Sequence, residues 1–102
     1  NINQKKIIKQ PDIYIVSIGE NAINYSIKIA DLLRTGNQLI VMNDTLRRSP
    51  KSQMKEANKY NAKHVIMIGD DEIKKDQVII KNMDTGDQKT IEIDSILTFF
   101  HN

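Results

Sequence analysis

The residues best suited to chemistry form an acidic cluster directly after a run of apolar residues. The apolar run Val65–Ile68 is followed by Gly69 and then by three acids, Asp70, Asp71 and Glu72. Ionised carboxylates only accept hydrogen bonds, so the cluster can receive N–H donors from a ligand or coordinate a hard cation such as Mg²⁺. If the apolar run is a strand of an open parallel sheet, its carboxyl end is where a ligand is expected to bind.

Basic residues gather at a second point of the sequence. Arg47 and Arg48 precede Ser49-Pro50, a pair that is a strong signal for the start of a helix. Free backbone N–H groups at a helix start favour anions. Three lysines then recur at every fourth position of this helix: Lys51, Lys55 and Lys59. Lysines alone are typical of a solvated helix surface, but with the two arginines they form a candidate phosphate-binding ridge beside the acidic cluster.

Several other chemistries lack their motifs. The chain has no GxGxxG, no GxxxxGK[ST] and no HExxH pattern. Of the two histidines, His64 is expected to be structural and His101 to lie in an exposed tail. Asp70 and Asp71 could bind Mg²⁺ in the manner of a phosphoacceptor domain, but such a domain also needs an acid after its first strand, where this chain has Ser17-Ile18-Gly19. No metal site and no cofactor are therefore predicted for this chain.

The composition is that of one globular domain. The 102 residues are 39% hydrophobic and 27% charged, and the net charge of +2 is too small to indicate a nucleic-acid partner by itself. The absence of cysteine excludes disulfides and suits a reducing compartment. No apolar run approaches the roughly 18 residues of a membrane span, so no membrane partner is expected. Residues 1–10 are predicted to be a linker from a missing N-terminal domain, and residues 11–102 the domain itself.

Periodic apolar residues predict the elements that would position these groups. Buried strands are expected at residues 13–16, 39–42 and 65–68. A helix is expected between N-cap Asn21 and C-cap Gly36, with four apolar residues at helical spacing: Ile23, Ile27, Ala30 and Leu33. A second helix should run from Ser49 to about Tyr60 and bury Met54 and Ala57. This alternation predicts a parallel sheet with right-handed crossovers.

The remaining third of the chain changes rhythm. Strands are predicted at residues 77–82 and 89–93, joined by the turn residues 84–87 as a hairpin, and Asp94 can cap a last helix. The predicted fold class is therefore a three-layer α/β/α domain with a five-stranded mixed sheet, in which a parallel βαβαβ core is followed by an antiparallel hairpin and a C-terminal helix. The loops at residues 19–21, 43–48 and 69–72 should lie side by side at the carboxyl ends of the parallel strands.

Three segments resemble a known family. They are ADLLRTG (residues 30–36), QMKEANKYNAKHVIMIGDDE (residues 53–72) and VIIKNMDTGDQ (residues 78–88). Within them, Gly69-x-x-Glu72 and Lys81 have the spacing of the Gly-x-x-Glu motif and the following strand lysine of that family. The chain is similar over residues 12–100 to the C-terminal anticodon-binding domain of class II aminoacyl-tRNA synthetases, most closely the histidyl type. Gln53 and the Asp87-Gln88 hairpin favour histidine, although the family usually has Glu where this chain has Asp87.

The resemblance implies a tRNA anticodon stem-loop as the partner. It implies that Glu72 and Lys81 face the anticodon bases and that Asn43, Arg47 and Arg48 approach the same loop. Lys51 and Lys55 of the phosphate-binding ridge are then expected to hold phosphates. A carboxylate can accept the N–H donors that guanine presents on its Watson–Crick edge. Glu72 is expected to read a base, with Lys81 on the neighbouring strand to orient it or to share the base, while Asp70 and Asp71 cap the turn. The implied parent enzyme is a cytoplasmic homodimer whose separate catalytic domain uses ATP and Mg²⁺.

Alternatives remain open at this point. The threonyl-, prolyl- and glycyl-tRNA synthetases share the anticodon-binding fold, and a synthetase-like regulator could keep the fold without reading tRNA. A flavodoxin-like domain binding a small molecule at the same sheet edge is a rival of another class. That rival needs a phosphate-binding loop after the first strand, where Gly19-Glu20-Asn21 is short and acidic.

Overall fold

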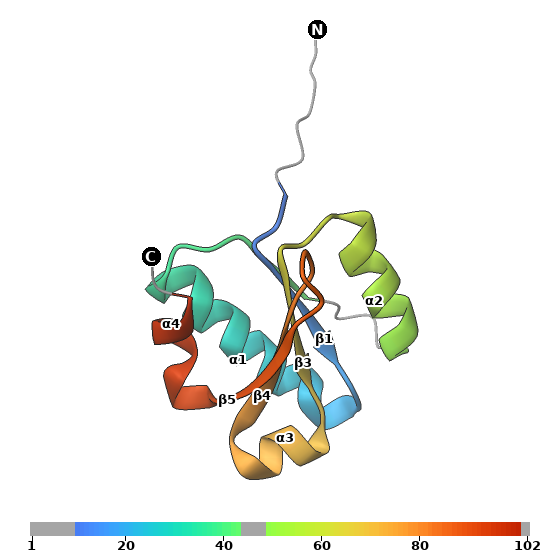
Figure 1. The fold of residues 1–102 in the computed structure, drawn as a ribbon. Helices are drawn as coiled ribbons and strands as arrows, with labels where there is room; N and C mark the ends of the chain where they lie inside the picture. Colours follow the sequence, from blue (N-terminus) through green and yellow to red (C-terminus); the bar gives the residue numbers. More distant parts are fainter. Residues whose placement is uncertain (1–9, 44–48, 101–102) are drawn as a thin grey trace, which may run out of the picture.

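Five strands form one sheet in the order β2-β1-β3-β4-β5 (Figure 1). Their bounds are β1 (Ile13–Ser17), β2 (Val41–Asn43), β3 (His64–Ile68), β4 (Gln77–Asn82) and β5 (Gln88–Glu92). β1 pairs in parallel with β2 and β3, whereas β3–β4 and β4–β5 are antiparallel. The computed structural model describes residues 10–43 and 49–100. The predicted mixed α/β fold class is confirmed.

One face of the sheet is buried beneath two helices, and we call it the covered face. Its residues alternate along three strands: Ile13, Ile15, Ile66, Ile68, Val78 and Ile80. Helix α1 (Glu20–Gly36) packs on it through Ile29, Ala30 and Leu33, and α4 (Ile96–Phe99) adds the buried Ile96. The register of α1 differs from the prediction, because Ile27 is 46% exposed while Ala22 and Ser26 are buried.

The opposite face, which we call the open face, has α2 (Pro50–Lys59) packed above β1. Its cluster contains Tyr14, Val16 and Val65 from the strands and Ala57 from α2. Farther across the sheet the residues of this face become half-buried on β4 and exposed on β5, where Thr90 stands opposite Ile79. The open face is therefore a surface that begins beneath α2 and ends in solvent.

Some predicted boundaries were wrong. Helix α1 begins after Gly19 rather than at Asn21, and Asn37 rather than Gly36 is its C-cap. β2 is only three residues long and starts at Val41. Residues 93–95 form a short 3₁₀ turn, η1 (Ile93–Ser95), so the predicted cap Asp94 lies inside that turn and the N-cap of α4 is Ser95. The largest omission is α3 (Asp70–Lys75), where the sequence predicted a loop.

The start of α2 follows the prediction closely. Ser49 is the N-cap, its side chain accepts a hydrogen bond from the backbone N–H of Ser52, and Pro50 occupies the first helical turn. Ala57 is buried as predicted, whereas Met54 is only half-buried and Gln53 takes the second buried position. An amide in place of an apolar residue at that position is explained by what it binds, described below.

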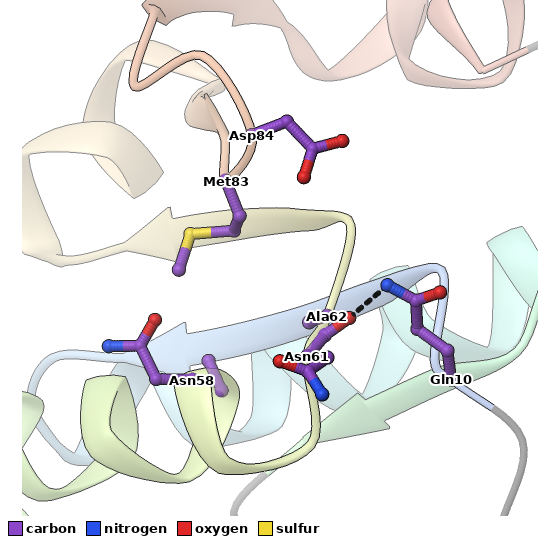
Figure 2. Close-up of a pocket in the computed structure, with 7 residues that line it drawn as sticks. Gln10, Asn58, Asn61, Ala62, Met83 and Asp84 are labelled. Carbon is purple, nitrogen blue, oxygen red and sulfur yellow. Dashed lines mark hydrogen bonds between the residues drawn. The ribbon is translucent and has the colours of Figure 1, made fainter.

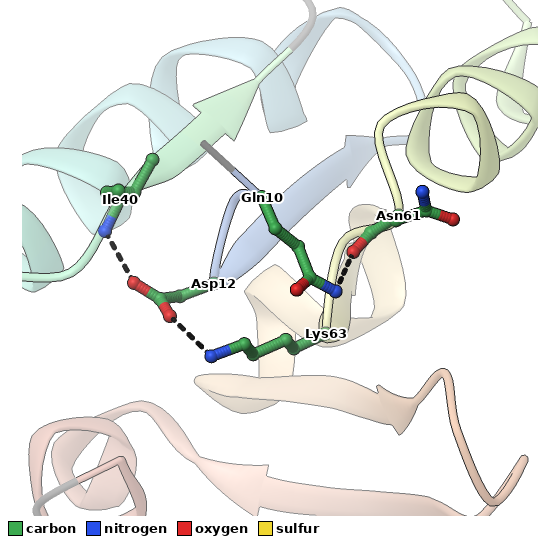
Figure 3. Close-up of polar contacts among 5 residues, drawn as sticks. All are labelled: Gln10, Asp12, Ile40, Asn61 and Lys63. Carbon is green, nitrogen blue, oxygen red and sulfur yellow. Dashed lines mark hydrogen bonds and ion pairs between the residues drawn. The ribbon is translucent and has the colours of Figure 1, made fainter. Parts of the chain in front are cut away.

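The chain reaches the sheet at the amino end of β1, where polar contacts tie three segments together (Figure 3). The Asp12 carboxylate accepts the backbone N–H of Ile40 at 2.8 Å and lies 3.6 Å from Nζ of Lys63. The side-chain amide of Gln10 donates to the carbonyl of Asn61. These contacts join the residues before β1 to those before β2 and β3.

Candidate nucleic-acid interface

The carboxyl ends of the parallel strands meet at one edge of the sheet, as predicted. The backbone N–H of Ile18 donates to the carbonyl of Ile68 at 2.8 Å, which joins the ends of β1 and β3. A Cβ placed on Gly19 would lie 3.9 Å from a carboxylate oxygen of Asp70. Gly19 has φ +95, a conformation that glycine adopts without strain. The first and third loops are therefore adjacent, and the acids of α3 lie beside the start of α1.

Glu72 has a role that the sequence did not predict. Its Oε1 accepts the backbone N–H of Gly69 at 2.8 Å, which is the glutamate half of a capping box at the start of α3. The expectation that Asp70 and Asp71 would cap the turn was wrong, since Glu72 forms the cap and both aspartates are exposed. A Cβ on Gly69 would lie 3.0 Å from this Oε1. The Glu72 carboxylate is therefore held in one orientation.

The structure does not bring Glu72 and Lys81 together. Lys81 pairs with Val65 near the amino end of β3, whereas Glu72 follows the carboxyl end of that strand. The three steps from Val65 to Ile68 span about 10 Å at the usual rise per strand residue. The antiparallel direction of β4 explains the error, because β4 runs back along β3 and carries Lys81 away from α3 towards the amino end of that strand. Lys81 is half-buried on the open face.

Gln53 substitutes for a missing residue of β2. The peptide groups of Ser17 point to the β2 side of β1, but β2 ends at Asn43, which pairs with Ile15. The Gln53 amide, only 2% exposed, accepts the N–H of Ser17 at 2.7 Å and donates to its carbonyl at 2.8 Å. One side-chain amide thus replaces the next peptide group of the ladder. Since an unpaired buried peptide group is costly, this contact fixes α2 to the sheet edge.

The Ser17 side chain continues this buried polar network into α1. Its hydroxyl is hydrogen-bonded to that of Ser26, and Ser26 donates to the carbonyl of Ala22 at 2.6 Å. The network therefore connects α2, β1 and α1 immediately behind the edge. The sequence contains a signal for one member of it, Ser26, because the neighbours of Ser26 at helical spacing are apolar.

The predicted basic residues are only partly described. Lys51 and Lys55 are exposed on α2, and Lys51 lies in the turn nearest the edge. Arg47 and Arg48 lie outside the described residues. Asn43 is half-buried, and its side-chain oxygen is 3.5 Å from a guanidinium nitrogen of Arg34, which also donates to the carbonyl of Val41 at 2.6 Å. Arg34 is a cation beside Asn43 that the sequence did not single out.

His64 lies at the far end of the covered face, away from the edge. Its ring meets Phe100 edge to face at 5.3 Å between centroids. Burial lowers the pKa of His64, although the nearby Asp84 and Asp12 oppose that shift. The packing supports the structural role predicted for His64, and His101 lies outside the described residues.

The described residues contain neither a candidate metal-binding group nor a candidate membrane-spanning helix. Within residues 10–43 and 49–100, no group of three or more His, Asp or Glu side chains is placed to hold a metal ion. The helices of these same ranges are all too short or too polar to cross a bilayer.

Comparisons with known proteins agree with the resemblance seen in the sequence. A family model described as the anticodon binding domain matches residues 12–102. The histidine–tRNA ligase of Acetivibrio thermocellus is 42% identical over 90 residues, which cover 88% of this chain and 21% of that protein. The Staphylococcus aureus histidine–tRNA ligase is 39% identical over 89 residues, covering 87% and 21%. The chain thus spans about a fifth of the length of these curated relatives.

Solved structures give the same result. Apo S. aureus histidyl-tRNA synthetase superposes with a TM-score of 0.83 at 38% identity, over 89% of this chain and 23% of that one. The RNA binding domain of threonyl-tRNA synthetase from Cryptosporidium parvum superposes with a TM-score of 0.81 at 18% identity, over 89% and 23%. The second likeness shows the fold alone. Together these findings favour the synthetase interpretation over a flavodoxin-like small-molecule domain.

Proposed function

The chain belongs to the anticodon-binding domain family, and from that membership we propose that it binds the anticodon loop of histidine tRNA as part of a histidine–tRNA ligase. Residues 11–102 form the anticodon-binding domain, and residues 1–10 lead to it from a catalytic domain. That catalytic domain attaches histidine to its tRNA with ATP and Mg²⁺. The parent enzyme is a homodimer in the cytoplasm.

The observation that carries the proposal is the identity of 42% to a histidine–tRNA ligase over nearly the whole chain. The geometry of the edge supports it. An anticodon is single-stranded, so its Watson–Crick edges are free for protein side chains. Phosphate contacts position the RNA, and base contacts specify it. An edge with one oriented carboxylate, Glu72, and exposed lysines on α2 offers both kinds of contact.

We assign the roles by position. Glu72 reads a base through Oε2, because Oε1 is engaged by Gly69. Lys81 contacts a different nucleotide, since the register of β4 separates it from Glu72. The last residue of β2 and residues between β2 and α2 approach the same loop, and the exposed lysines of α2 hold phosphates. The first group is Asn43, Arg47 and Arg48, and the second is Lys51 and Lys55.

The first test is direct binding. Fluorescence anisotropy of the histidine anticodon stem-loop, titrated with this chain at two salt concentrations, should show weak binding that weakens further as salt rises, because each phosphate contact releases counterions. Lys55→Ala should reduce affinity equally for cognate and altered loops, whereas Lys89→Ala on β5 is the matched control. No binding to any stem-loop would refute the proposal. An affinity that does not change with salt concentration would refute the assigned phosphate contacts.

Glu72→Gln tests base reading without removing the helix cap. Glutamine can keep the capping-box contact with Gly69, so α3 should remain folded. The amide replaces one acceptor by an NH₂ donor, which opposes a guanine donor. Affinity for the cognate loop should fall about tenfold, the scale of a lost base contact. A loop whose guanine is replaced should be bound equally by both proteins. Asp71→Asn is the charge-matched control and should change neither affinity.

A further inference from the structure

A cavity of about 310 Å³ lies beside α2 at the end of the sheet opposite the acidic edge (Figure 2). Its apolar wall is formed by Ala57 and Ala62, which belong to the open-face cluster, and by Met83, which packs against that cluster. The volume is at the small end of the roughly 300–1,000 Å³ typical of small-molecule pockets. It therefore suits one planar ring system better than a whole nucleotide or a peptide.

The rim of this cavity is polar and rich in acceptors. It consists of Gln10, Asn58, Asn61 and Asp84. Asp84 and Asn58 are exposed and come from opposite sides, the β4–β5 turn and the last turn of α2 (Figure 2). None of the seven described lining residues is basic, and one is a carboxylate. Such a rim disfavours phosphate and favours an uncharged ring that presents N–H donors.

The cavity adjoins Lys81, which in the proposed function contacts a different nucleotide from the one that Glu72 reads. Lys81 lies on β4 only two residues before Met83, which is about 7 Å at the usual rise per residue, and on the same face of the sheet. The exposed Lys59 follows Asn58 on α2. Cations thus flank the cavity without lining it, an arrangement that can hold an RNA backbone outside while a base enters.

We propose that this cavity binds one nucleobase of the same RNA strand, a guanine whose N1–H and N2–H groups are accepted by Asp84. This assignment rests on the proposed function and extends it, because the base bound here is a different nucleotide from the one that Glu72 reads. The Asn58 amide borders the ring, and Met83 packs against its face. Reading is thereby divided between two separated points on the domain.

The test is a set of cycles between Asp84→Asn and inosine replacement of each loop guanine in the histidine anticodon stem-loop. Inosine lacks the 2-amino group, so it removes one of the two donors. Asp84→Asn should weaken binding about fivefold or more, and inosine at one position should remove most of that difference. Asp87→Asn is the matched control, because it removes the same charge from the same turn outside this cavity.

A second variant removes a polar group from the rim without altering charge. Asn58→Leu replaces an exposed amide on α2 by an apolar group of the same shape and should weaken binding while the thermal midpoint changes little. If Asp84→Asn and Asn58→Leu both bind as tightly as the wild type, the base subsite is refuted while anticodon binding stands. The subsite is also refuted if Asp84→Asn weakens binding and inosine at no guanine position reduces that loss of affinity. If the wild-type chain binds no stem-loop, both proposals fall.

Discussion

The covered face and the open face of the sheet are built from different residues. Isoleucine, valine, leucine and alanine fill the covered face, and each of the cluster's twelve core residues is buried. All four methionines of the chain pack against the smaller cluster of the open face: Met42, Met54, Met67 and Met83. Branched side chains have few rotamers and pack rigidly, whereas methionine is flexible and adapts to irregular surfaces. The covered face is therefore suited to stability and the open face to binding.

The same division continues along single strands. On β4, Val78 and Ile80 are buried on the covered face, while Ile79 and Lys81 alternate with them and are half-buried on the open face. Alternation in a strand normally separates core from solvent. Here the open-face side chains of β4 are only half-buried: Ile79 is apolar, and Lys81 is a cation beside the cavity that we assign to a base.

The largest effect expected from this comparison is on folding. Leu33→Ala on the covered face removes a fully buried side chain and should lower the free energy of unfolding by about 2–5 kcal/mol. Met67→Ala on the open face should cost at most about 1–2 kcal/mol, because Met67 already meets solvent. Urea denaturation of both variants gives the two values. Equal losses would contradict the division of roles between the faces.

A smaller effect is expected from the contact that holds α2, the helix of the open face. Gln53→Met keeps the side-chain volume but leaves the N–H and carbonyl of Ser17 without the amide. The free energy of unfolding should fall by about 1–3 kcal/mol, the cost of buried groups left unpaired. Gln88→Met on the exposed strand β5 is the control and should be within about 0.5 kcal/mol of the wild type. If both variants behaved alike, packing alone would hold α2.

The smallest effect is a pH dependence at the rim of the covered face. Burial lowers the pKa of His64 in the folded chain below its usual 6.5, so the unfolded chain binds a proton more readily. Stability should therefore be complete above pH 6.5 and decline as the pH falls through that value. Thermal midpoints between pH 5.5 and 7.5 should show this decline in the wild type and less of it in His64→Gln. An unchanged slope would place the titrating group elsewhere.

Sequence alone predicted the fold well because apolar periodicity and helix caps are local signals. The buried strand Ile13–Ser17 and the Ser49-Pro50 helix start are examples. α3 escaped prediction because its six residues carry no buried position, so no apolar period marks it. The shift at Ile27 has a similar cause, since the apolar spacing fits two neighbouring helix faces and only packing decides between them.

The site was harder to predict than the fold because its geometry depends on contacts between distant segments. Spacing alone suggested that Glu72 and Lys81 could meet, and only the antiparallel register shows that they do not. The contact of Gln53 with Ser17 joins residues 36 positions apart. Local sequence patterns could not predict the cavity, because its lining comes from residue 10, from the end of α2 and from the β4–β5 turn.

The contacts at the start of β1 also determine how the domain would bear tension (Figure 3). The backbone N–H groups of Asp12 and Ile13 both donate to Ile40 on one side, while Pro11 and Asp12 accept from Lys63 and His64 on the other. A pull on residue 10 along β1 would shear these bonds simultaneously rather than open them one after another. Because resistance to force depends on the unfolding rate, such loading should make the domain mechanically strong in this direction. The strand would then act as an anchor that transmits movement of the preceding polypeptide to the whole sheet.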